Sequence, residues 1–333
     1  MSSESSSETM MQVFGKIVRH LSDHGLAFTL RRAVWRLHYE RYERLRRRQN
    51  HGTLPRLIHF LDREFELHPS MEGLSDELRL YGVHEPIATG AYLRLLSLGD
   101  QVLDIGANIG YYPLLASKAV GERGRVLGFE PAPSVYAVLR RNIERSGRTN
   151  IEVYPWAVGN KSETTKFYES AVANWGSLVR SDQLLQKEGV PVQVRRLDDI
   201  AKDFPDFHPK VLRMDIEGGE MMVLEGAQSV LEQYRPSLFI EFHPFAIRWE
   251  AVHSTFDRLR QLGYSSGTLI QRTWDQPWMN KWMRERRCWS GSLDALIRRI
   301  EAPKDGLRHS VFSFILKRPQ VDLHSLGNDG LGT

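Results

Sequence analysis

The chain has 333 residues, of which 41% are hydrophobic and 26% are charged. This ordinary globular composition excludes a collagen-like, fibrous or largely disordered protein. The length fits one domain of about 200–250 residues with appended segments. The single cysteine, Cys288, excludes an internal disulfide and a thiolate zinc site, and it favours a reducing compartment.

The N-terminal sequence has no secretory pattern, and no stretch approaches the roughly 18 apolar residues of a membrane-spanning helix. We therefore expect a cytoplasmic protein. Residues 1–10 are rich in Ser and Glu, which is typical of a disordered tail. Residues 319–333 are expected to form a C-terminal tail.

Residues 11–55 are predicted to be a basic helical arm that ends in a linker. The formal net charge of the chain is +4, and most of its basicity lies in this arm. Three interpretations stay open for residues 26–48: packing on the protein's own body or on a second copy, contact with the cytoplasmic membrane face, and binding of a partner. We expect no nucleic-acid binding, because no recognisable module for it follows. The apolar residues at helical spacing are Leu26, Leu30, Val34, Leu37 and Leu45, with Trp35 and Tyr42 beside them.

Residues 100–318 alternate strands with helices after an N-terminal cap over residues 56–99. This alternation predicts parallel βαβ units with helices on both faces of a sheet. The segment 160–200 is predicted to insert an antiparallel hairpin before the fourth strand. The predicted strands cover residues 101–105, 125–130, 151–156, 210–216, 237–242, 264–271 and 311–318, and the predicted helices cover 111–120, 134–146 and 219–234.

The turn after the first predicted strand points to a cofactor site. Its sequence from Asp104 to Gly110 places Gly106, Asn108 and Gly110 in a G-x-N-x-G pattern and departs from the G-x-G-x-x-G of dinucleotide sites. A carboxylate at Asp104 would repel a pyrophosphate and attract an ammonium group. Glu130 ends the next strand, where a carboxylate can accept both hydroxyls of a ribose. These features favour S-adenosylmethionine over NAD.

Five runs in fixed order resemble the FkbM family of S-adenosylmethionine-dependent methyltransferases: GDQVLDIGANIGYY, GRVLGFEP, NIEVYPWAVG, LRMDIEGGE and RPSLFIEFH. The similarity covers residues 81–243. It implies a Rossmann-like class I fold, with a seven-stranded, mostly parallel sheet and an antiparallel last strand. It also implies O-methylation of a hydroxyl on a sugar, glycoconjugate or natural-product scaffold.

The resemblance also implies roles for individual residues at the cofactor. Gly106, Asn108 and Gly110 would meet the methionine moiety and Glu130 the ribose. Trp156 and Ala157 would border the adenine, with Trp156 equally well explained as a core aromatic. Glu85 matches a family acid expected near the methionine end.

Three side chains at strand ends are the candidates for chemistry. Asp215 ends the fourth predicted strand, and Glu241 and His243 end the fifth. Asp215 is the first candidate for the base or the acceptor-orienting group, and a neutral His243 is the second. Binding of Mg²⁺ by these three residues stays open.

Two segments are candidates for acceptor binding. Asn174 and Trp175 lie in the loop of the inserted hairpin. Trp274 and Trp278 belong to a Trp/Arg-rich segment, residues 272–290, which suits a glycan or glycolipid acceptor. Its composition is also typical of a protein interface, including that of a homo-oligomer, and favours this alternative slightly. A small-molecule acceptor also stays open.

Two other functional classes compete with an S-adenosylmethionine-dependent O-methyltransferase. The first is an NAD-dependent dehydrogenase, against which Asp104 and Asn108 count. The second is a non-catalytic protein that binds a membrane or a partner on a methyltransferase fold.

Overall fold

The structure, a computed structural model, describes residues 26–49, 56–68, 74–167, 189–243, 249–272, 275–279, 287–301 and 311–317. The chain divides into two compact units, one of residues 1–54 with 278–280 and the other of residues 55–277 with 281–333. The predicted segment limits 11–55, 56–99 and 100–318 stay predictions.

The larger unit is built on an eight-stranded mixed sheet. Strands β5, β4, β3, β9 and β10 are parallel, whereas β13 runs antiparallel between β10 and β11. This order confirms the predicted Rossmann-like fold with an antiparallel last strand. The additional strand is β12, which pairs with β11 at the sheet edge and was not predicted. In spatial order the strands are β12 (Cys288–Ser292), β11 (Ser266–Gln271), β13 (Phe312–Leu316), β10 (Ser237–Phe242), β9 (Val211–Met214), β3 (Gln101–Ile105), β4 (Arg125–Phe129) and β5 (Ile151–Tyr154).

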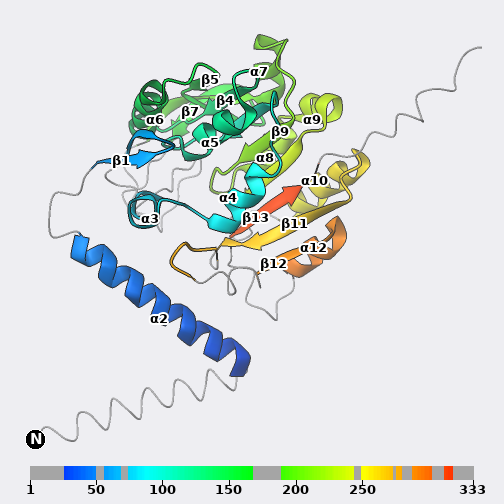
Figure 1. Cartoon of the computed structure of the whole chain (residues 1–333). Helices are drawn as coiled ribbons and strands as arrows, with labels where there is room; N and C mark the ends of the chain where they lie inside the picture. Colours follow the sequence, from blue (N-terminus) through cyan, green and yellow to red (C-terminus); the bar gives the residue numbers. More distant parts are fainter. Residues whose placement is uncertain are drawn as a thin grey trace, which may run out of the picture. The chain divides into compact units, whose positions relative to one another are not determined.

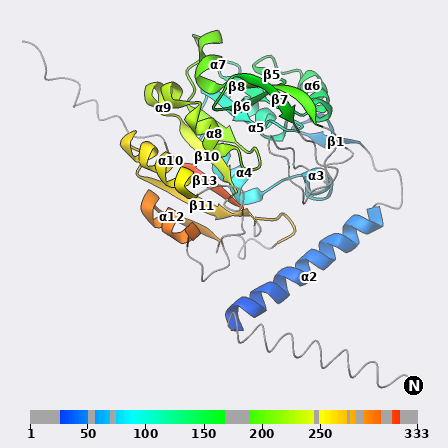
Figure 2. The ribbon, with the colours of Figure 1, turned by 180° about the vertical axis from the view of Figure 1, so that it is seen from behind.

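Helices cover both faces of this sheet (Figures 1 and 2). Successive strand residues point to opposite faces, so Leu103 belongs to one hydrophobic core and Val102 to the other. Helices α3 (Leu74–Tyr81), α4 (Pro86–Leu93), α5 (Tyr111–Val120) and α6 (Pro133–Ser146) contribute to the core of Val102. Helices α7 (Leu197–Asp203), α8 (Glu220–Glu225), α9 (Gln228–Tyr234), α10 (Trp249–Gln261) and α12 (Leu293–Glu301) contribute to the core of Leu103.

The predicted third strand, residues 151–156, is divided between two sheets. Strand β5 ends at Tyr154, and after Pro155 the chain enters β6 (Trp156–Gly159) of a separate three-stranded sheet. Proline has no N–H for a sheet ladder, which explains the break at this position. In the second sheet, β8 (Val190–Arg196) lies between β6 and β7 (Glu163–Phe167) and pairs antiparallel with β7, as predicted for the inserted hairpin.

A short antiparallel hairpin precedes α3. It consists of β1 (Leu57–Phe60) and β2 (Arg63–Glu66). The two turn residues, Leu61 and Asp62, have φ of 52° and 66°. Positive φ at both central positions is the geometry that matches the twist of a two-residue hairpin.

The predicted helix over residues 219–234 is two helices, α8 and α9, separated at Gly226. A Cβ built on Gly226 would lie 2.0 Å from the carbonyl oxygen of Gly159. The Gly226 carbonyl in turn accepts a hydrogen bond from the Asp198 N–H at 2.9 Å. The break therefore lies where the backbones of α8 and the second sheet touch, and only glycine fits this contact.

We expect Gly226→Ala to destabilise the protein by about 2 kcal/mol or more, because the new methyl group would push the two backbones apart. Gly147→Ala is the matched control: its φ of 65° makes alanine strained, but the space around it is open. Its expected cost is about 1 kcal/mol. Urea unfolding measures both, and equal losses for the two variants would contradict the close-packing explanation.

The smaller unit contains α2 (Leu26–Gln49), which confirms the predicted helix. Its packed side chains are aromatic: the ring of Trp278 lies 5.8 Å from Tyr42, 5.8 Å from Trp35 and 5.9 Å from Tyr39. Leu37, from the predicted apolar stripe, stays 66% exposed. The part of the chain that the structure describes contains no helix with the length and apolar character needed to cross a bilayer.

Candidate active site

The turn between β3 and α5 has the special backbone geometry that its glycines predict. Gly106 and Gly110 have φ of 82° and 103°, and Asn108 between them has φ of 51°. A Cβ on Gly106 would lie 2.0 Å from the carbonyl oxygen of Asp215. The turn is thus pressed against the end of β9, and glycine is required at this contact.

The amides of the turn are satisfied within the protein. The N–H groups of Gly106 and Ala107 both donate to the carbonyl of Phe129 at 2.9 Å, and the Gly110 N–H donates to the Ala107 carbonyl at 3.0 Å. The Ile109 N–H donates to Oδ1 of Asn108 at 2.7 Å. Asn108 itself donates to the carboxylate described next, so all five amides from 106 to 110 have acceptors.

Glu130 follows the last residue of β4 and lies beside this turn. Its Oε2 accepts the Asn108 N–H at 3.0 Å, and its Oε1 accepts the Ala132 N–H at 2.9 Å. The side chain is almost buried and its orientation is set by these two bonds. A carboxylate at the end of a strand can accept a ligand hydroxyl.

The environment of Asp104 differs from the predicted one, because a buried arginine forms an ion pair with its carboxylate. Asp104 is fully buried, and its Oδ1 lies 2.9 Å from Nη1 of Arg213. The same Nη1 donates to the Gly106 carbonyl, and Nη2 lies 2.9 Å from Oδ2 of Asp215. Burial raises the pKa of Asp104 to about 6 in spite of Arg213. This ion pair does not favour direct attraction of a ligand ammonium group by Asp104, whose role at a cofactor stays a prediction.

The three candidates for chemistry do converge at the strand ends. Oxygen or nitrogen atoms of Asp215, Glu241 and His243 lie within 4.8 Å of one another. The side chain of Asp215 is 25% exposed, whereas those of Glu241 and His243 are 4% and 2% exposed. Of the three, Asp215 is the side chain that a ligand can reach.

His243 is held as a cation. Its Nδ1 lies 2.9 Å from Oε1 of Glu220, and its Nε2 lies 3.0 Å from Oε2 of Glu217. Burial alone would lower the pKa of His243, but these carboxylates outweigh it and raise the pKa well above its ordinary value. Both ring nitrogens are engaged and the raised pKa favours the protonated ring, so these contacts do not favour a neutral base, and the role of His243 stays a prediction.

Glu241 and Glu85 share one arginine. Nε of Arg272 contacts Oε1 of Glu85 and lies 2.8 Å from Oε1 of Glu241. Burial and the neighbouring carboxylates of Asp215 and Glu85 raise the pKa of Glu241 well above its ordinary value. For Glu85 burial acts in the same direction, but His84 and Arg272 outweigh it and lower the pKa. Glu85 thus lies close to the cluster, inside an ion-pair network, and its role near the methionine end of a cofactor stays a prediction.

His84 closes this network on the α3 side. Its Nδ1 lies 2.7 Å from Oε2 of Glu77, and its Nε2 lies 3.3 Å from Oε1 of Glu85. Burial lowers the pKa of His84, but the two carboxylates outweigh burial and raise it to about 10. The strand ends thus carry a buried row of alternating charges in which acids outnumber bases.

The donor set of Asp215, Glu241 and His243 does not fit Mg²⁺. Glu241 already contacts the guanidinium of Arg272, and both nitrogens of His243 contact carboxylates that keep the ring protonated. Mg²⁺ prefers oxygen ligands, and a protonated imidazole cannot bind any metal. The carboxylates of Asp215 and Glu241 are instead paired with the guanidinium groups of Arg213 and Arg272.

The other predicted site residues are Trp156, Ala157, Trp278, Asn174, Trp175 and Trp274. Trp156 stacks on Tyr154 with ring centroids 4.6 Å apart, and the guanidinium of Arg195 lies 4.5 Å from its ring centroid. These contacts are those of an aromatic ring that packs between the two sheets. Ala157, the next residue, is buried. Trp278 belongs to the smaller unit. Asn174, Trp175 and Trp274 lie outside the described residues.

Two arginines of the site, Arg213 and Arg272, are not among the residues predicted from the sequence. Arg213 is the one charged residue in the otherwise apolar strand Val211–Met214, and all four residues are buried. A charge in a strand buried on both faces requires a partner, which was the available signal. Arg272 was grouped with the Trp/Arg-rich segment, but the structure places it at the carboxylate cluster.

Comparison with known proteins assigns this region to a family. Residues 104–266 match the family model described as the methyltransferase FkbM domain. Residues 104–266 are an FkbM methyltransferase domain. The match begins at Asp104, and it includes the glycine turn, Glu130, Arg213, Asp215 and His243.

Relatives of the FkbM domain are similar over part of their length. The methyltransferase sdnD of Sordaria araneosa is 28% identical over 41% of this chain and 67% of its own. The hexuronic acid methyltransferase AglP of Haloferax volcanii is 24% identical over 43% of this chain, and the alignment spans 56% of that relative. The crystal structure of a methyltransferase FkbM from Methylobacillus flagellatus KT has 21% identity and a TM-score of 0.36, covering 51% of this chain and 39% of that one.

The pKa of His84 predicts a pH dependence of stability. Since the pKa rises from 6.5 to about 10 on folding, the stabilisation is complete below pH 6.5 and is lost as the pH rises toward 10. The loss is about 1.4 kcal/mol per pH unit within this window. We expect His84→Gln to destabilise the protein strongly at pH 6 and much less at pH 10. The measurement is urea unfolding across this range, with His59→Gln on the exposed side of β1 as control. A constant difference between wild type and His84→Gln would contradict the assignment.

Proposed function

We propose that the FkbM domain transfers a methyl group from S-adenosylmethionine to an oxygen atom of an acceptor. One observation carries this proposal. All five backbone N–H groups from 106 to 110 already donate hydrogen bonds within the protein, next to the carboxylate of Glu130. A dinucleotide needs free amides in this turn for its pyrophosphate. A phosphate-free nucleoside needs only acceptors for its ribose hydroxyls, and these Glu130 supplies.

The charge of the site also favours this cofactor over NAD. Carboxylates outnumber cations at the strand ends, so a positively charged ligand would reduce their mutual repulsion. The sulfonium and ammonium groups of S-adenosylmethionine provide such charge, whereas a pyrophosphate would increase the repulsion. The dehydrogenase alternative is therefore disfavoured both by the turn and by its surroundings.

In this proposal the protein aligns the acceptor and removes its proton. When bound, the cofactor supplies a methyl carbon activated by its sulfonium sulfur, and the acceptor oxygen bonds to that carbon as the carbon–sulfur bond breaks. Asp215 is the residue that we assign to the acceptor hydroxyl, because its carboxylate is partly exposed at the strand ends, whereas Glu241 and His243 are buried. Arg213 holds that carboxylate in one orientation, which suits general-base catalysis or acceptor alignment.

The acceptor that we favour is a sugar, a glycoconjugate or a natural-product scaffold. One relative is a hexuronic acid methyltransferase, which supports a sugar-type acceptor for this chain. Asn174, Trp175, Trp274 and Trp278 remain our candidates for acceptor binding. Peripheral membrane contact through residues 26–48 and a homo-oligomer also remain hypotheses.

Cofactor binding tests the first step. We expect wild-type protein to bind S-adenosylmethionine and S-adenosylhomocysteine in calorimetry and to ignore NADH. Glu130→Gln should weaken binding of S-adenosylmethionine roughly tenfold or more, because a charged hydrogen-bond acceptor for the ribose is lost. Glu163→Gln, an exposed glutamate on β7, is the control and should bind as the wild type does. Tight NADH binding without binding of S-adenosylmethionine would reverse the proposal.

Turnover tests the role of Asp215. The assay supplies a labelled methyl donor with a panel of sugars, uronic acids and glycolipids. With an accepted substrate, Asp215→Asn should keep cofactor affinity and lose roughly 10²- to 10⁴-fold in kcat. Asp206→Asn, at an exposed aspartate before β9, is the control. Unchanged kcat in Asp215→Asn would remove Asp215 from the mechanism, and cofactor binding with no transfer to any acceptor would favour a non-catalytic protein.

A further inference from the structure

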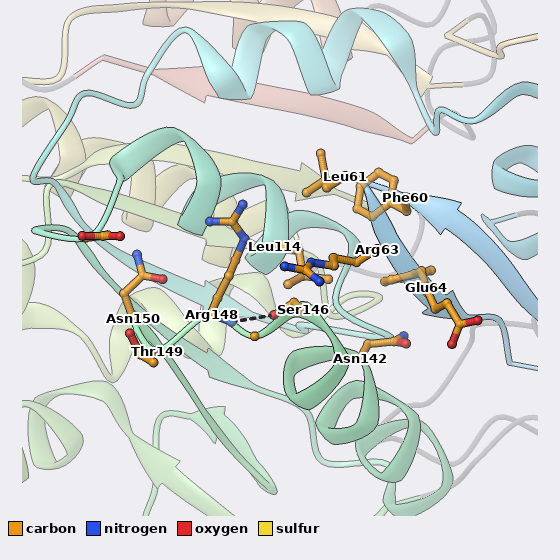
Figure 3. A pocket seen from close by; sticks show the side chains of 13 residues that line it. Phe60, Leu61, Arg63, Glu64, Leu114, Asn142, Ser146, Arg148, Thr149 and Asn150 are labelled. Atoms are coloured by element: carbon orange, nitrogen blue, oxygen red, sulfur yellow. Dashed lines mark hydrogen bonds between the residues drawn. The ribbon is translucent and has the colours of Figure 1, made fainter.

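A pocket lies between the β1–β2 hairpin, helices α5 and α6, and the loops that precede β4 and β5 (Figure 3). Its cavity volume is about 250 Å³. The loops before β4 and β5 lie at the amino ends of these parallel strands, opposite the ends that carry Glu130 and Asp215. The pocket therefore belongs to a different part of the domain from the candidate active site.

Two arginines enter this pocket from different walls. Figure 3 shows the side chain of Arg63 extending inward from the hairpin and that of Arg148 rising from the loop before β5. Within the described ranges, neither guanidinium has an ion pair. Two carboxylates, Glu64 and Glu122, also line the pocket and pair with neither arginine. Glu64 neighbours Arg63 on β2, so the two side chains point to opposite faces of the strand.

The nearby arginines outside the pocket are paired, which distinguishes them from these two. Glu66 accepts both Arg141, at 2.8 Å, and Arg145, at 2.6 Å. The hydrogen bond from Arg141 is the largest of the effects that lower the pKa of Glu66, which reaches about 2. Both carboxylate oxygens of Glu66 thus contact Arg141 or Arg145, and Glu66 forms no ion pair with Arg63 or Arg148.

Three other polar side chains of the pocket, those of Asn142, Asn150 and Ser146, are already engaged in hydrogen bonds. Asn142 bonds to the backbone of Glu66 and to the Ile109 carbonyl, and Asn150 bonds to Ser117 and to the Gly121 carbonyl. The Ser146 hydroxyl donates to the Ile143 carbonyl. Among the described residues that line the pocket, the charged donors without a hydrogen-bond or ion-pair partner are thus the two guanidinium groups of Arg63 and Arg148. Phe60, Leu61 and Leu114 form the apolar part of the wall.

We propose that this pocket binds a small oxyanion group, a phosphate or a carboxylate, between Arg63 and Arg148. Guanidinium groups recognise both oxyanions through paired N–H donors, and two of them converging on one anion relieve their own repulsion. The cavity is slightly smaller than typical pockets for drug-sized ligands, so it suits a single such group with a short apolar portion. The proposal is independent of methyl transfer.

Calorimetry on the full chain tests the proposal with two probes, inorganic phosphate and succinate, at low ionic strength. We expect saturable binding of at least one probe, and which one binds identifies the oxyanion. Arg63→Gln and Arg148→Gln should each weaken binding roughly tenfold or more, because a charged donor is lost. Arg298→Gln, an exposed arginine on α12, has the same change in net charge and should leave binding unchanged.

Three outcomes would overturn the proposal: no saturable binding of either probe, wild-type affinity in both pocket variants, or equal loss of affinity in Arg298→Gln. Arg63→Lys with Arg148→Lys is a further check, since it keeps the charge and removes the paired donor geometry. This variant should bind more weakly than the wild type and more tightly than the glutamine variants. Thermal unfolding of each variant establishes that the fold is retained.

Discussion

Arg213 lies inside the sheet, where its guanidinium contacts the carboxylates of Asp104 and Asp215 and the carbonyl of Gly106. These contacts join the end of β3, the glycine turn and the end of β9. Its planar face also lies over the ring of Tyr112, at 4.1 Å from the ring centroid. Because buried ions are stable only when they are paired, removal of Arg213 would leave uncompensated charge at a cost of about 3–5 kcal/mol. The position of Asp215, and with it the proposed chemistry, depends on this arginine.

The same principle extends along the strand ends. Arg272 lies between Glu85 and Glu241, and His243 lies between Glu217 and Glu220. Every one of these cations comes from the protein, so the carboxylates are held in place before any ligand arrives. Such preorganisation reduces the rearrangement that binding and catalysis require. The excess of acids that remains is the charge that we assign to attraction of a cationic cofactor.

The sequence predicted the sheet well, because short apolar strands and helices with clear ends alternate in it. It failed where a tertiary contact decides the local structure. The contact of Gly226 with Gly159 divides a helix, and Pro155 moves the chain from one sheet to another. The candidate site was predicted by position, since Asp215, Glu241 and His243 do meet. The ionisation of Glu241 and His243 could not be predicted, because it depends on Arg272, Glu217 and Glu220, which reach these side chains from other segments.

Asn142 has one further consequence. It is buried on α6, and its amide binds the backbone of Glu66 in the hairpin and the carbonyl of Ile109 in the glycine turn. Two segments more than 40 positions apart in the sequence are therefore fastened to the same side chain. Fraying of the hairpin and loosening of the turn should then occur as one cooperative event, so that hydrogen exchange would report the same opening free energy for both.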